Sequence, residues 1–159
     1  MKKQLESLGK ILGTDRKTDS PIEEILYQEF LRYGIKPIPQ YSIGVFFADL
    51  AFPDVKLIIE ADGQAWHSTK EQIERDKYRA DKIASLGWRI ERYTGSYIHK
   101  NFQAIVAKVM LQFFEDKMTD EQIFHAKGRI VDFLTRNRFT ELAGQIVDEE
   151  IEARNLLLN

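Results

Sequence analysis

Cysteine is absent from the 159 residues of this sequence. Its absence excludes a disulfide framework and thiolate metal ligands, so a bound metal ion would need oxygen or imidazole ligands. Such ligands favour a hard cation such as Mg²⁺ or Mn²⁺. The sequence also lacks a run of about 18 apolar residues and a signal-peptide pattern. We therefore expect no membrane partner and a cytoplasmic location.

An excess of charge of one sign is missing as well, since the formal net charge is −2. Domains that bind nucleic acid usually carry a basic surface. The balance changes along the chain: residues 115–159 hold 10 acidic and 6 basic side chains, a net −4, and residues 1–114 hold 15 acidic and 17 basic, a net +2. Charge alone therefore neither supports nor excludes a nucleic-acid partner.

What is present is enough apolar material for a core, with 43% hydrophobic residues. Ser20 as N-cap, Pro21 at the first helical position and Glu23 in a capping box predict a helix that ends near Gly34. The pattern then predicts strand, strand, strand, helix, strand and helix over residues 37–42, 45–52, 56–62, 70–86, 88–93 and 101–114. This order predicts an α/β fold with a mixed β-sheet flanked by helices, whose third and fourth strands are parallel because a helix connects them.

Residues 118–159 carry two further amphipathic patterns, which predict a C-terminal helical appendage over residues 120–135 and 140–155. We therefore expect an N-terminal segment (1–19), an α/β domain (20–117) and a helical extension (118–159). The extension offers a surface through which the chain could form a homodimer or join a larger complex.

Acidic residues occur where two of the predicted strands should be apolar. Glu60 and Asp62 share one strand face with Ile58, because side chains alternate along a strand. Asp49 lies in the same way inside the strand before it. If residues 54–55 form the hairpin tip, Asp49 stands directly opposite Glu60, with Cβ atoms roughly 4.5–5.5 Å apart.

Like charges at that separation repel, and neither strand core contains a lysine. We therefore expect a metal ion held by Asp49, Glu60 and Asp62. An ordinary alternative stays open for two of them: Glu60 could pair with an arginine of the next strand, such as Arg89 or Arg92, and Asp62 before a glycine is typical of a turn.

Further candidates lie near these carboxylates in the sequence. Glu23 fits its capping box and needs no other role. His67, in the loop after the third strand, could be a general base or contact a phosphate, although a lone loop histidine is more often neither. Arg75 and Arg79 form a basic stripe on one helix, and the interleaved acidic residues are more typical of a solvated, ion-paired face than of phosphate contacts.

Five blocks of the sequence resemble, in order and spacing, the very-short-patch-repair-like (Vsr-like) branch of the PD-(D/E)XK nuclease superfamily. The blocks are Ser20–Glu23, Phe47–Leu50, Leu57–Gln64 with Trp66 and His67, Arg75-Asp76 and Gly87–Tyr93, all within residues 20–114. The resemblance implies a restriction-endonuclease-like fold and Mg²⁺-dependent cleavage of phosphodiester bonds in DNA.

By position, the resemblance implies that Asp49 is the metal-binding aspartate and Glu60 the second acidic ligand. Asp62 stands where many relatives have lysine, which removes a charge-stabilising ammonium and leaves the general base open. His67 and Glu23 match a histidine and a helix-borne glutamate of this branch.

The sequence thus predicts a metal-dependent DNA endonuclease in which Arg75, Arg79 and Arg92 help to position the DNA backbone. Two alternatives stay open. One is a catalytically inactive nuclease-fold subunit that binds DNA or other proteins through its helical tail. The other is an RNA-directed nuclease or a helical interaction protein.

Overall fold

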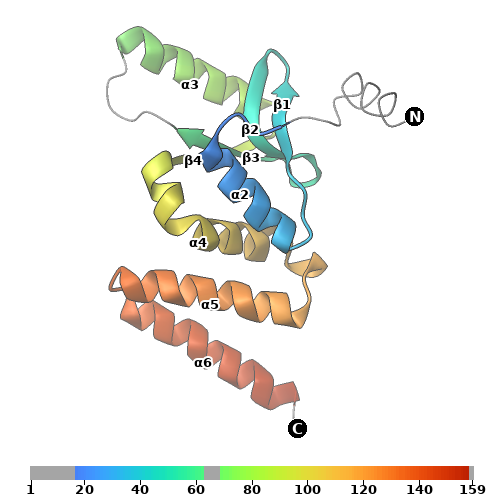
Figure 1. The fold of residues 1–159 in the computed structure, drawn as a ribbon, viewed down its shortest axis with the longest axis vertical. Coiled ribbons are helices and arrows are strands. Elements are labelled where there is room, and N and C mark those ends of the chain that lie inside the picture. The colour runs from blue at the N-terminus through green and yellow to red at the C-terminus, as the bar shows by residue number, and fades with distance from the viewer. Residues whose placement is uncertain (1–16, 63–68, 158–159) are drawn as a thin grey trace, which may run out of the picture. The chain divides into compact units, whose positions relative to one another are not determined.

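The computed structural model describes residues 17–62 and 69–157 (Figure 1), so the predicted site residue His67 lies outside the described residues. The chain divides into two compact units, within residues 1–100 and 101–159. The division falls inside a single helix, α4 (Gly95–Phe113). The domain boundaries expected after residues 19 and 117 stay predictions.

A four-stranded sheet organises the first unit (Figure 1). Its neighbouring strands run antiparallel from the first to the second and from the second to the third, and parallel from the third to the fourth. In sheet order the strands are β1 (Ile38–Ile43), β2 (Phe46–Phe52), β3 (Leu57–Asp62) and β4 (Arg89–Thr94). The helix α3 (Lys70–Ser85) connects the parallel pair. The predicted α/β fold with a mixed sheet and flanking helices is confirmed.

Two helices cover opposite faces of this sheet. On α2 (Pro21–Arg32), the Phe30 ring meets the Phe52 ring edge-on, with 4.7 Å between centroids. From α3, Ile83 packs in an apolar cluster with Ala51 and Ile58. Because adjacent side chains of a strand point to opposite faces, Phe52 and Ala51 place α2 and α3 on different sides of the sheet.

The starts of α2 and α3 follow side-chain caps, as the sequence predicts. Ser20 Oγ accepts a hydrogen bond from the Glu23 amide at 3.2 Å. The Glu23 carboxylate, however, accepts from the Asp19 amide at 2.8 Å, so the return bond of the capping box is displaced by one residue. Thr69 begins α3 with a complete capping box to Gln72.

The helix α4 begins at Gly95, earlier than the expected Asn101. Thr94 Oγ1 accepts a hydrogen bond from the Tyr97 amide at 3.3 Å, which is the bond of an N-cap. The dipeptide Thr94-Gly95 is typical of a turn, and apolar periodicity is weak in the first turn that follows. The capping residue Thr94 is therefore present in the sequence, but the glycine after it favours the prediction of a turn at this position.

The second unit contains the rest of α4 and two helices that pack on each other, α5 (Asp120–Arg136) and α6 (Thr140–Leu157). Lys127 Nζ of α5 and Glu150 Oε2 of α6 join them at 2.8 Å. The predicted C-terminal helical appendage is confirmed. Over the described part of the chain, every helix is too short or too polar to cross a membrane.

Candidate active site

The hairpin of β2 and β3 has the register that the sequence predicts. Leu50 pairs with Ile59 and Ala51 with Ile58. One step further, this register brings Asp49 level with Glu60, but the backbone pairing ends at Leu50. There, Asp49 Oδ2 accepts a hydrogen bond from the Ala61 amide at 2.8 Å. A carboxylate thus replaces a backbone carbonyl as the link between the two strands.

The pairing of β1 with β2 is also interrupted at Asp49. Its neighbours Leu50 and Ala48 pair with Pro39 and Tyr41, which leaves Gln40 level with Asp49. Gln40 has a φ of 48°, a left-handed conformation that costs a non-glycine residue about 1–3 kcal/mol. Backbone strain of this kind concentrates at functional sites, and here it lies beside the predicted metal ligand.

Two arginines hold Glu60, which is only 7% exposed. From α3, Arg79 Nη2 donates to Glu60 Oε1 and also to the Phe47 carbonyl oxygen, the latter at 2.7 Å. From β4, Arg92 Nε donates to Glu60 Oε2 at 2.9 Å. Two guanidinium groups therefore place positive charge beside Glu60. Of the two pairing partners considered for Glu60, the structure brings Arg92 to it.

The surroundings of Asp49 disfavour its charged form. Burial raises the pKa of Asp49 above its ordinary value of 3.8, and the charges of Glu23 and Glu60 raise it further. The Ala61 hydrogen bond and the Arg79 charge lower this pKa but do not cancel the rise. A cation bound at Asp49 would remove this electrostatic cost.

Glu23 lies close enough to Asp49 for its charge to act there, but its own oxygens are already used. It is 5% exposed. Glu23 accepts hydrogen bonds from the Asp19 amide at 2.8 Å, from Ser20 Oγ at 2.9 Å and from Gln40 Nε2 at 3.3 Å. The structure therefore gives Glu23 a capping role and places its charge near Asp49.

Asp62 ends β3 and is exposed to solvent. It lies level with Thr94 of β4, on the strand face that also carries Glu60. Across residues 17–62 and 69–157, no three His, Asp or Glu side chains converge closely enough to hold a metal ion. Asp49 and Glu60 are consequently the pair around which a site can be built.

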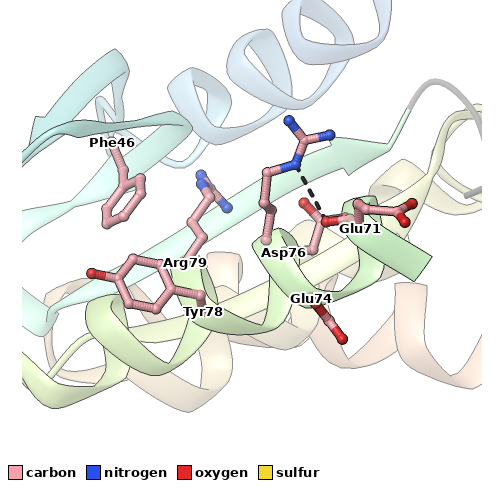
Figure 2. Close-up of a pocket in the computed structure, with 7 residues that line it drawn as sticks. Phe46, Glu71, Glu74, Asp76, Tyr78 and Arg79 are labelled. Carbon is pink, nitrogen blue, oxygen red and sulfur yellow. Dashed lines mark hydrogen bonds between the residues drawn. The ribbon is translucent and has the colours of Figure 1, made fainter. Parts of the chain in front are cut away.

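A cleft of about 860 Å³ opens beside Arg79, between α3 and the start of β2 (Figure 2). Figure 2 shows the Arg79 side chain rising from α3 towards Phe46, with Tyr78 on the same side. The remaining lining is Glu71, Glu74, Arg75 and Asp76. Arg75 Nε donates to the Glu71 carbonyl oxygen at 3.3 Å. The acidic side chains give this side of α3 a surface of mixed charge. Such a surface is typical of a solvated, ion-paired helix face.

The contact of Arg79 with Glu60 is the feature that the sequence did not reveal. In the sequence, Arg79 belongs to a row of basic residues on one face of a helix, and this pattern predicts a contact with DNA phosphates. One signal was available: a crossover helix between two parallel strands packs over those strands, so its inward arginine can reach a strand carboxylate. Whether Arg79 or Arg75 faces the strand carboxylate depends on how α3 is rotated about its axis. That rotation is set by the packing of α3 against the sheet.

Residues 22–112 match the model of the REase_MTES_1575 family. The chain belongs to this restriction-endonuclease-like family.

Relatives and a solved structure show more distant similarity. Two uncharacterized proteins of Mycobacterium tuberculosis, from strains CDC 1551 and H37Rv, are 31% identical over 83 residues, which are 48% of this chain and 30% of each relative. An uncharacterized protein of Haemophilus influenzae is 31% identical over 85 residues, 54% of this chain and 64% of that protein. The chain thus spans less than two thirds of these relatives. The catalytic domain of the homing endonuclease I-Bth0305I has 18% identity and a TM-score of 0.46, over 60% of this chain and 99% of that domain.

Proposed function

We propose that the chain is a Mg²⁺- or Mn²⁺-dependent endonuclease that hydrolyses phosphodiester bonds in DNA, in the Vsr-like branch whose sequence blocks it resembles. The observation that carries the proposal is the half-buried carboxylate of Asp49, which lies beside Glu60 with its pKa raised by burial and by neighbouring acids. Such perturbed groups cluster at functional sites. Membership of a restriction-endonuclease-like family supports the same conclusion.

The residues present fit a small hard cation. Mg²⁺ is usually held by one or two carboxylates, with water and substrate phosphate completing its shell. Asp49 and Glu60 supply two such carboxylates. Each oxygen of an ionised carboxylate can accept two hydrogen bonds or ligands, so the arginine contacts of Glu60 leave it coordination capacity. A bound ion would neutralise phosphate charge and lower the pKa of a water molecule.

The other site residues have proposed roles around this pair. Glu23 supports Asp49 from the outer sphere, and Asp62 acts through a bridging water molecule. His67 orients the attacking water or protonates the leaving oxygen. Arg92, whose side chain is 33% exposed, contacts a phosphate, and Arg75 of α3 contacts the DNA backbone.

Cleavage of plasmid DNA with Mg²⁺ or Mn²⁺ tests the proposal. Replacing a residue that only supports metal ligands costs about 10–100-fold in affinity or activity, so we expect Asp49→Asn and Glu60→Gln to lose at least about 100-fold. Asp81→Asn, which changes an exposed carboxylate on α3, is the matched control and should cleave like the wild type. Equal activity in all four proteins would refute the site.

A second candidate is a nuclease-fold binding subunit without catalysis. One observation favours it, because both Glu60 oxygens are engaged by arginines. The resemblance to the Vsr-like branch points the same way, since it implies lysine where this chain has Asp62. Calorimetric titration with Mn²⁺ separates the candidates, because a working site binds the ion and an inactive one binds none. Duplex DNA, branched DNA and RNA compared as substrates would define the nucleic acid. Light scattering would test a homodimer through α5 and α6.

A further inference from the structure

Arg79 connects the two strands of the candidate site. Its Nη2 donates to the Phe47 carbonyl oxygen of β2 at 2.7 Å and to Glu60 Oε1 of β3. The guanidinium carbon lies 5.9 Å from the centroid of the Phe46 ring, and the side chain is 21% exposed. We call this pair of hydrogen bonds the Arg79 bracket. A helix residue thereby joins the strand that carries Asp49 to the strand that carries Glu60.

The Arg79 bracket lies where the backbone pairing of β2 and β3 stops. Beyond Leu50 and Ile59, their described backbones no longer pair. The strands are joined there by side chains instead, through Asp49 Oδ2 with the Ala61 amide and through the Arg79 bracket. Side-chain contacts therefore set the separation of the two carboxylates.

Arg92 offers an internal comparison, because it binds the same carboxylate without this connection. It lies level with Glu60 on β4 and donates one hydrogen bond, from Nε to Glu60 Oε2 at 2.9 Å. Within the described residues it makes no hydrogen bond to β2. Both arginines supply a positive charge to Glu60, but only Arg79 also fixes where β2 lies.

We propose that Arg79 is a positioning residue that fixes the spacing of Asp49 and Glu60, and that it does not contact DNA. This inference rests on the proposed function, since the spacing matters only if both carboxylates bind one ion.

Calorimetric titration of Mn²⁺ without DNA, on wild type, Arg79→Lys and Arg92→Lys, tests the inference. Lysine keeps the charge but replaces a planar fork of donors by a single ammonium, so each variant changes geometry alone. We expect Arg79→Lys to weaken Mn²⁺ affinity about 10-fold or more, in the range of lost outer-shell support. Arg92→Lys should weaken Mn²⁺ affinity less than Arg79→Lys does, because it disturbs the contact with Glu60 but leaves the β2 contact intact.

Amide hydrogen exchange supplies a readout without metal. If the Arg79 bracket holds the strands together, the Ala61 amide should exchange faster in Arg79→Lys than in wild type or in Arg92→Lys. Melting temperatures show whether each variant is folded. If Arg79→Lys does not fold, Arg79→Gln and Arg92→Gln, which both lose the positive charge at Glu60, replace the pair, and the Arg79 variant should again show the larger loss.

The outcomes separate this inference from the proposed function. Wild-type Mn²⁺ affinity in Arg79→Lys, or unchanged exchange at Ala61, would overturn the inference alone. Equal weakening in both variants would also overturn it, because contact with Glu60 would then suffice. A wild-type protein that binds no Mn²⁺ would overturn the proposed function, and the inference with it.

Discussion

The two halves of β3 differ in their side chains and in their backbone pairing with β2. Residues Leu57–Ile59 are completely buried and pair with both β2 and β4. Residues Glu60–Asp62 pair with β4 but not with the described backbone of β2, and two of the three are acidic. Where backbone pairing ends, side chains of Asp49 and Arg79 make the connections. One strand therefore combines a half that stabilises the fold with a half that carries the site.

The largest expected effect on stability lies in the apolar half. Ile58→Ala removes a side chain that is 0% exposed, and a large-to-small change in a core costs about 2–5 kcal/mol of the free energy of unfolding. Urea denaturation measures it. Phe47→Ala is the control, because that ring is 61% exposed and its loss should cost below about 0.5 kcal/mol. A loss at Ile58 no larger than at Phe47 would contradict the comparison.

Beside the polar half we expect a substitution of Asp49 to stabilise the fold, whereas Ile58→Ala destabilises it. Burial, and then the charges of Glu23 and Glu60, raise the pKa of Asp49 in the folded protein. An acid with a raised folded pKa binds its proton more tightly when folded, so stability is lost as the pH rises through that pKa. Asp49→Asn should therefore unfold at a higher temperature than wild type near neutral pH, although by less than Ile58→Ala lowers it.

The pH dependence provides the check on Asp49→Asn. Below about pH 4 both the folded and the unfolded carboxyl become protonated, so the advantage of the variant should disappear. Thermal melts of wild type and variant across the acid range measure this. A variant that is less stable than wild type at neutral pH would mean that the Ala61 hydrogen bond outweighs the charge repulsion.

The smallest effect is expected at the turn that leads into the apolar half. Lys56 has a φ of 49°, a left-handed conformation that costs about 1–2 kcal/mol for a non-glycine residue. Glycine relieves this strain, but it loses more backbone entropy on folding than lysine does. Lys56→Gly should therefore stabilise the fold by about 0.5 kcal/mol without changing Mn²⁺ affinity. Lys56→Ala, which keeps the strain, should not stabilise it.

Local patterns in the sequence were sufficient for most of the fold. The strand limits agree with the structure within one residue, and the short turn placed Leu50 opposite Ile59. The helix cap at Ser20 was also predictable from the sequence. The left-handed Gln40 was not, because glutamine has no preference for that conformation and only the surrounding contacts impose it.

The candidate site was predictable only in part, because some of its contacts depend on tertiary packing. Asp49 and Glu60 belong to one hairpin, so the alternation of strand side chains and a short turn bring them together without help from the rest of the chain. Arg79 lies 19 residues beyond Glu60, on a helix whose rotation over the sheet is set by apolar packing around Ile83. The sequence by itself determined that two acids meet on adjacent strands; only the tertiary structure decided which cations neutralise Glu60, because their approach depends on how α3 and β4 pack against it.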